Sequence, residues 1–117
     1  MKLNDFKKGF LEDLTNKKWA AKIETETQQE ILREQESTAD RMLEQIKVSQ
    51  DFIAEMEKDP SREARDKRRA EETKLSGLEK NLKDQQEEMD KTLKGIEKWQ
   101  RQEEILSIYI KKAEENK

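Results

Sequence analysis

Residues 75–110 read LSGLEKNLKDQQEEMDKTLKGIEKWQRQEEILSIYI, and the spacing of their apolar side chains decides the fold. Gaps of three and four residues alternate, as in a heptad repeat whose a and d positions form one narrow seam against another helix. The apolar seam positions are Leu75, Leu78, Leu82, Met89, Ile96, Trp99, Leu106 and Ile110, with Gln85, Thr92 and Glu103 as polar gaps. This stretch therefore predicts a long helix of the coiled-coil kind.

A second heptad seam lies upstream. Its a positions are Leu32, Ala39, Ile46 and Ile53, and its d positions are Met42, Ser49 and Met56. Leu43, Val48 and Phe52 lie beside this seam and widen it, which favours packing against more than one neighbour and leaves a homo-oligomer open. Both halves of the chain are thus expected to be helical, in an all-α fold.

The strongest break between the two seams is Asp59-Pro60-Ser61. The residue before a proline is disfavoured in the α region, so the first helix should end near Lys58. Asp59 is expected to cap the second helix, with Pro60 as its first residue. Two heptad helices joined by so short a turn fold back as an antiparallel hairpin, which would bring Ala39 near Leu82. The competing topology is a chain that only kinks at Pro60 and pairs with other copies as an extended rod.

The N-terminal residues carry a third apolar pattern. Leu3, Phe6, Phe10 and Leu14 follow helical spacing, which predicts a short amphipathic helix that packs at the open end of the hairpin as a three-helix cap. The expected organisation is a single helical domain over 1–117. It consists of a short helix over 1–18, a first long helix over 19–58, a turn over 59–61 and a second long helix over 62–115.

Composition excludes most catalytic chemistry. The 117 residues contain neither Cys nor His, which removes disulfides, thiolate and imidazole metal sites, and nucleophiles that depend on His. No glycine-rich phosphate loop or calcium loop is present. We therefore expect no enzyme activity, no metal and no cofactor. No apolar run approaches the roughly 20 residues that span a bilayer, so we predict a cytoplasmic protein without a membrane span.

Three surfaces are candidates for binding. The protein-interface candidates at the apolar end are Phe6, Phe10, Leu14, Trp19, Trp99, Leu106, Tyr109 and Ile110. The acidic-stem candidates are Glu30, Glu34 and Glu88, and the basic-tip candidates are Arg65, Arg68 and Arg69. Acids are interleaved with the tip arginines and the net charge is −3, so nucleic acid is a poor fit as a partner.

The predicted function is a non-enzymatic coiled-coil interaction module: an assembly factor, adaptor or scaffold that binds a protein partner, itself, or both. The alternative is a small inhibitor whose acidic stem blocks a basic, nucleic-acid-handling target. In outline the chain resembles the short, charged, helical scaffolding proteins of phages and phage-encoded inhibitors of host defence. No motif of either group can be placed on its residues.

Overall fold

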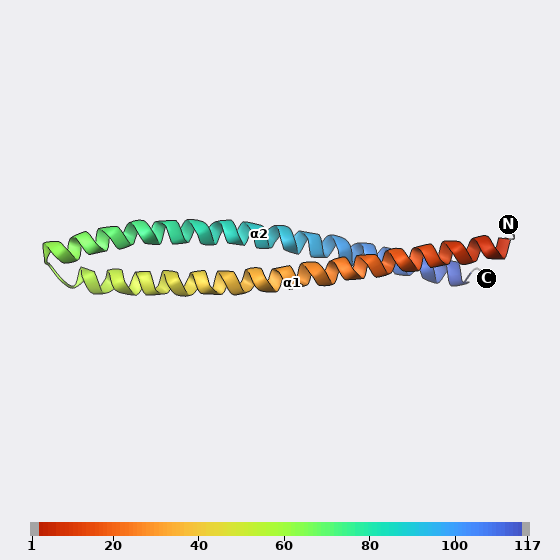
Figure 1. The fold of residues 1–117 in the computed structure, drawn as a ribbon, viewed down its shortest axis with the longest axis horizontal. Helices are drawn as coiled ribbons and strands as arrows, with labels where there is room; N and C mark the ends of the chain where they lie inside the picture. The colour runs from red at the N-terminus through yellow and green to blue at the C-terminus, as the bar shows by residue number, and fades with distance from the viewer. Residues whose placement is uncertain (1–2, 116–117) are drawn as a thin grey trace. The chain divides into compact units, whose positions relative to one another are not determined.

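The computed structural model describes residues 3–115, with side chains from residue 7 onward. Two helices account for almost all of this range: α1 runs from Leu3 to Glu57 and α2 from Arg62 to Glu115 (Figure 1). No strand lies within the described residues. The all-α prediction is confirmed.

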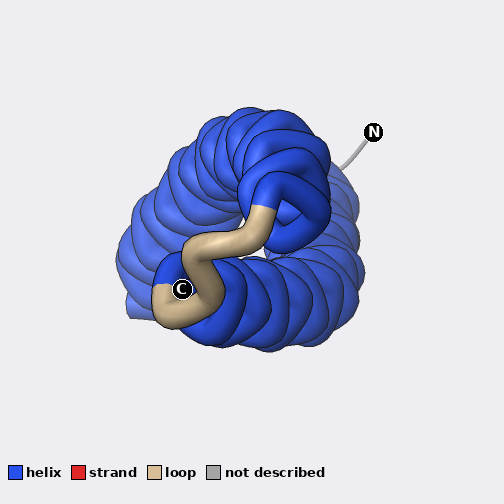
Figure 2. Tube along the Cα trace, turned by 90° about the vertical axis from the view of Figure 1, so that its left-hand side faces the viewer, coloured by secondary structure: helices blue, strands red, loops and turns tan. Residues whose placement is uncertain are grey.

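The chain divides into two compact units, each built from a segment of both helices. The terminal unit combines residues up to Leu32 with residues from Lys91 onward, and the tip unit comprises Arg33–Asp90. In the tip unit, a short loop joins α1 to α2 and the two helices lie antiparallel (Figure 2). The helical hairpin is therefore confirmed for this unit, and the rod that only kinks at Pro60 is wrong.

One hydrogen bond records the register of the two helices in the tip unit. The Gln85 side-chain Nε2 donates to the backbone carbonyl of Gln35 at 3.2 Å. If Ala39 lies opposite Leu82 in an antiparallel pair, then Gln35, four residues earlier, should lie opposite residue 86. The observed partner of Gln35 is Gln85, so the predicted register is correct to within one residue. This agreement follows from matching two heptad seams across a short loop.

Burial in the tip unit follows the heptad positions of both helices. The partly or fully buried seam positions are 35, 39, 42, 46, 49, 53 and 56 on α1, and 64, 68, 71, 75, 78, 82, 85 and 89 on α2. The most deeply buried of them are small: Ala64 is 3% exposed and Ser49 is 2% exposed. Two helices alone can surround a small side chain completely but not a large one, so most of the large apolar seam residues of this unit stay partly exposed.

The terminal unit continues the same three–four alternation. Its partly or fully buried seam positions are 11, 14, 18, 21, 25, 28 and 32 on α1, and 92, 96, 99, 103, 106, 110 and 113 on α2. The sequence prediction missed Ala21 and Thr25, which are 1% and 6% exposed, because neither has a large apolar side chain. The Thr25 hydroxyl donates to the Ala21 carbonyl at 3.0 Å, so its buried oxygen is satisfied within the helix.

The separate N-terminal helix over 1–18 is absent, because α1 continues without interruption from Leu3 to Glu57. Residues 15–22 contain no proline or glycine, and the Thr15 hydroxyl bonds back to the Leu11 carbonyl of its own helix at 2.9 Å. Helix therefore propagates through the expected boundary between residues 18 and 19. The three-helix cap is wrong for the same reason: α1 supplies one of the two helices of the terminal unit, and residues 3–115 contain no third helix to cover them.

Residues 58–61 separate the helices. The Lys58 and Asp59 N–H groups donate to the Glu55 and Met56 carbonyls at 3.2 and 3.3 Å, closing the end of α1 with three-residue spacing. At the start of α2, the Ala64 N–H donates to Ser61 Oγ at 3.1 Å, and Ser61 also accepts the first helical hydrogen bond at its carbonyl. Ser61 is therefore the N-cap.

The predicted cap at Asp59, with Pro60 as the first helical residue, is wrong by two positions. The Ser61 N–H donates to Asp59 Oδ1 at 2.9 Å, so the Asp59 carboxylate closes the turn and does not cap the helix. This backbone hydrogen bond, followed by one to the Ser61 side chain, holds the pKa of Asp59 below its ordinary value of 3.8. Pro60 has no N–H to offer that carboxylate, so the next residue supplies the donor.

Candidate protein-interaction surface

Large apolar side chains are exposed on the terminal unit. The most exposed are Trp19 at 65%, Ile108 at 54%, Tyr109 at 53% and Phe10 at 51%. Ile23, Ile31, Leu93 and Ile105 of the same unit are also exposed. The seam of a two-helix pair is narrow, so apolar residues outside the a and d positions stay in contact with solvent.

The structure separates the predicted interface residues into two groups. Leu14 and Leu106 are buried at 7% and 5% exposure, and Trp99 and Ile110 are half-buried seam residues. Phe10, Trp19 and Tyr109 are exposed. Phe6 lies outside the described side chains. The first group holds the helix pair together, and the second is available to a partner.

The exposed aromatic residues do not all lie on one side of the unit. Phe10 precedes the seam residue Leu11 and Tyr109 precedes the seam residue Ile110, so both occupy g positions. In an antiparallel pair, the g positions of both helices border the seam from the same side, whereas Trp19 at a b position lies toward the other side. Phe10 and Tyr109 therefore share a flank that excludes Trp19.

Phe10 and Tyr109 also lie at nearly the same level along the helix pair. Lys18 and Glu103 line one shallow surface pocket, so these two residues lie near each other across the helix pair. Phe10 lies eight residues before Lys18 on α1, and residue 111 lies eight residues after Glu103 on α2. Phe10 is therefore close to the level of residue 111, which is two residues beyond Tyr109. Ile105 lies one turn before Tyr109 on the same side of α2. We call Phe10, Ile105 and Tyr109 the aromatic flank.

Basic side chains border the aromatic flank on α2. Ile105 lines a shallow pocket of about 260 Å³ whose other lining residues are Lys94, Glu97, Lys98, Arg101 and Gln102. The Lys98 ammonium lies 5.6 Å from the centre of the Trp99 ring, within range of a cation–π contact. The pocket contributes three positive charges against one negative charge, so its surroundings favour an acidic ligand.

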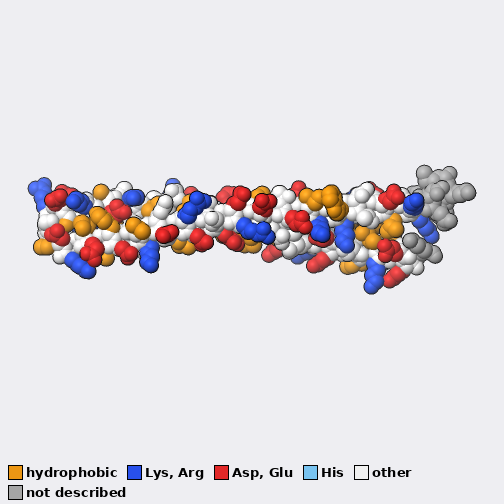
Figure 3. All heavy atoms as spheres, turned by 60° about the horizontal axis from the view of Figure 1, so that its bottom comes forward, with side chains coloured by type: hydrophobic (Ala, Val, Ile, Leu, Met, Phe, Trp, Pro, Cys, Tyr) orange, Lys and Arg blue, Asp and Glu red, His pale blue; other side chains and the backbone are white. Residues whose placement is uncertain are grey.

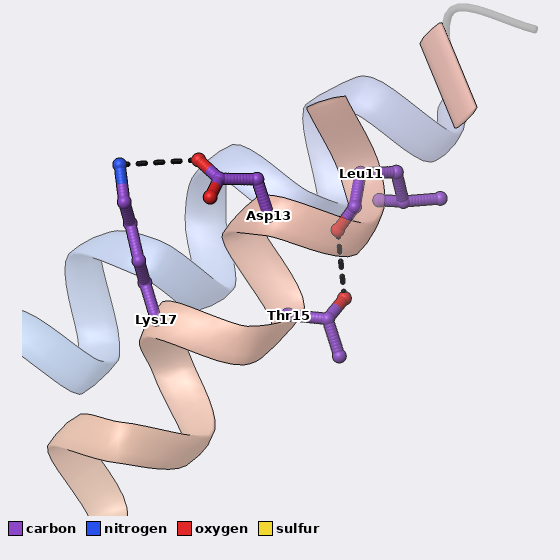
Figure 4. Close-up of polar contacts among 4 residues, drawn as sticks. All are labelled: Leu11, Asp13, Thr15 and Lys17. Atoms are coloured by element: carbon purple, nitrogen blue, oxygen red, sulfur yellow. Dashed lines mark hydrogen bonds and ion pairs between the residues drawn. The ribbon is translucent and has the colours of Figure 1, made fainter. Parts of the chain in front are cut away.

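Polar contacts on α1 near the aromatic flank are local to that helix. Lys17 Nζ lies 3.1 Å from Asp13 Oδ2 in an exposed pair one turn apart, and the Thr15–Leu11 hydrogen bond lies on the same stretch (Figure 4). Exposed pairs of this kind contribute only about 0.3–0.5 kcal/mol to helix stability. They support the helix locally and leave the apolar side chains beside them exposed.

The three basic-tip candidates occupy different environments. Arg65 and Arg69 are exposed, whereas Arg68 is half-buried at a seam position, 3.7 Å from Glu72. Lys67 pairs with Glu63 at 3.2 Å nearby. On the face shown in Figure 3, acidic and basic side chains alternate in the same way along the surface. Arg65 and Arg69 are one turn apart and share an exposed face of α2, whereas Arg68 lies at the seam, so the three candidates do not form one surface.

The acidic-stem candidates are all exposed but do not belong to one unit. Glu30 lies in the terminal unit, and Glu34 and Glu88 lie in the tip unit. The structure therefore brings at most Glu34 and Glu88 together. The inhibitor hypothesis built on this stem stays a prediction of the sequence.

Other kinds of site receive no support from the described residues. Within them, no three His, Cys, Asp or Glu side chains gather in a way that could hold a metal ion. Neither α1 nor α2, over the range described, contains a segment long and apolar enough to cross a bilayer. Comparisons with protein-family models, curated proteins and solved structures found no match for this chain.

Proposed function

We propose that this chain is a non-enzymatic, cytoplasmic interaction module whose terminal unit binds a protein partner through the aromatic flank. The observation that carries the proposal is the exposure of Phe10 and Tyr109, at 51% and 53%, on the same side of a helix pair and at nearly the same level. Aromatic side chains are common anchors of protein interfaces because they bury a large area with little loss of rotamer freedom.

The surroundings of the flank favour one kind of partner. The exposed flank of a helix pair can accept an amphipathic helix, whose apolar residues would contact Phe10, Ile105 and Tyr109. Lys98 and Arg101 lie beside Ile105, so acidic residues on the polar side of that helix would be attracted to α2. An assembly factor or adaptor that captures an acidic amphipathic helix combines these features.

The experiment is affinity capture with the immobilised chain and a double variant, Phe10→Ser with Tyr109→Ser. Proteins bound by the wild-type chain should be lost with the variant, and they should elute as salt rises if Lys98 and Arg101 take part. Trp99 is left unchanged because its half-buried ring belongs to the seam.

The matched control is Leu43→Ser, which removes an apolar side chain that is also 51% exposed but lies in the tip unit. This control should keep the captured proteins. Circular dichroism should show unchanged helix content for both variants, because none of the replaced residues is buried. Equal capture by the wild-type chain and the double variant would remove the aromatic flank as the binding surface.

A further inference from the structure

A groove of about 420 Å³ lies along one flank of the tip unit. Its lining includes Arg41, Val48 and Ser49 from α1, and Glu71, Lys74 and Leu78 from α2. Val48 is 64% exposed, and Phe52, one turn further along α1, is 38% exposed. Ser49 is 2% exposed, and its hydroxyl has no hydrogen-bond partner among the described residues. The groove therefore combines uncovered apolar side chains with an unsatisfied polar atom.

Opposite charges lie at equal distances on either side of the apolar centre of this flank of α1. Arg41, Val48 and Glu55 are seven residues apart, so they lie on one face of α1, with a basic end, an apolar middle and an acidic end. Their local pairings are weak: Arg41 donates to the Thr38 hydroxyl at 3.4 Å, and Glu55 forms an exposed ion pair with Lys58 at 3.2 Å. Both charged groups can exchange these pairings for stronger ones.

We propose that this flank binds a second copy of the chain, with the two α1 helices antiparallel and related by a two-fold axis at Val48. In that arrangement Val48 packs against its own counterpart, and Arg41 of each copy faces Glu55 of the other. A two-fold interface repeats each favourable contact twice. A parallel arrangement would instead oppose Arg41 to Arg41 and Glu55 to Glu55, which like-charge repulsion disfavours.

The α2 side of the groove fits the same arrangement. The Gln35–Gln85 register places Lys74 level with residue 46 of its own α1. The two-fold axis then brings residue 50 of the second copy level with Lys74, and Asp51 of the second copy follows directly in the chain. Lys74, which is only 4.0 Å from Glu71 within its own helix, would thus gain an acidic neighbour across the interface. In this arrangement Arg41 of α1 and Lys74 of α2 would each lie near an acidic residue of the second copy. This surface lies in the tip unit and is independent of the aromatic flank.

The test is the concentration-dependent mass of the full chain by analytical ultracentrifugation or light scattering. The wild-type chain should approach the mass of a dimer, and Val48→Asp should raise the dissociation constant by at least roughly tenfold. Leu43→Asp is the matched control, because Leu43 is similarly exposed but at an e position on the opposite flank. That control should leave the dimer intact.

Charge reversal tests the antiparallel geometry. Arg41→Glu and Glu55→Arg should each weaken the dimer by roughly tenfold, because each creates two like-charge contacts. The double variant, and an equimolar mixture of the two single variants, should both recover dimerisation. Capture of a partner by the aromatic flank should be unaffected in all of them.

Two outcomes would overturn the proposal. One is a wild-type chain that stays monomeric up to about 1 mM, the weak end of specific association. The other is a dimer that neither Val48→Asp nor the single charge reversals weaken, which would assign self-association to another surface. Because Val48, Arg41 and Glu55 are exposed, helix content measured by circular dichroism should not change in any variant.

Discussion

Replacing Ser49 with alanine should stabilise this protein, although Ser49 lies in its core. The side chain is 2% exposed and its hydroxyl lacks a partner among the described residues. A buried hydroxyl without a hydrogen bond costs about 1–3 kcal/mol, and the higher helix propensity of alanine adds roughly 0.5 kcal/mol. The free energy of unfolding of Ser49→Ala should therefore rise by about 1.5–3.5 kcal/mol.

Urea denaturation followed by circular dichroism measures this change, with all variants at one protein concentration. Ser37→Ala is the matched control because Ser37 is an exposed serine on the same helix, so it reports the propensity contribution alone. In a thermal scan, the gain for Ser49→Ala corresponds to about 4 °C per kcal/mol for a domain of this size. A Ser49→Ala variant no more stable than Ser37→Ala would contradict this prediction, since it would mean that the buried hydroxyl is satisfied.

Four further predictions concern the helix cap, the turn, the glycines and the seam. Ser61→Ala should lower the free energy of unfolding by about 1 kcal/mol, whereas Ser61→Asp should retain it, because only the latter keeps a side-chain acceptor for the Ala64 N–H. The lowered pKa of Asp59 means that its contribution to stability is present above pH 3.8 and is lost as the pH falls through the lower folded-state value. When the pH is lowered from 5 to below the folded-state pKa, the free energy of unfolding measured by urea denaturation should therefore fall less for Asp59→Asn than for the wild type. Gly77→Ala and Gly95→Ala should each raise the free energy of unfolding by about 0.5–1 kcal/mol. A new Cβ meets nothing within 4 Å at Gly77, and at Gly95 it meets only the Gln28 side chain, whose Oε1 is 3.7 Å away; a loss of stability would indicate a hidden clash. Leu106→Ala should cost about 2–5 kcal/mol because Leu106 is 5% exposed, while Leu93→Ala, at a residue 43% exposed, should cost less than about 1 kcal/mol, and equal costs would contradict the assigned seam.

Gly77 and Gly95 interrupt a strong helical pattern, and a glycine inside a helix can mark the close approach of a neighbouring helix or a local bend. The structure shows ordinary space around both, with helical backbone and no positive φ. Helix propensity is a weak preference, and a long heptad seam on either side outweighs one unfavourable residue.

The heptad spacing alone determined most of the fold. Leu75 to Ile110 and Leu32 to Met56 specified two helices with one buried stripe each, and Asp59-Pro60-Ser61 located the connection. These features are local: they depend on side-chain spacing along one helix and on the missing N–H of a proline. The exact cap was harder to predict, because Asp59 and Ser61 both offer a suitable oxygen and only the turn geometry selects between them.

Which apolar residues form the core and which remain exposed depends on how the two helices pack, and the spacing of residues along each helix did not predict it. Phe10 and Leu14 look equivalent in a helical repeat, yet Leu14 is 7% exposed and Phe10 is 51% exposed. Both residues belong to α1, which packs against α2 alone, so only the side chains at a and d positions are covered. Ala21 and Thr25 are the opposite case: both are buried, but their small side chains did not stand out in the apolar pattern of the sequence. A sequence pattern reports how apolar a side chain is, whereas burial depends on how many neighbours surround it, and a two-helix pair supplies neighbours on one side only.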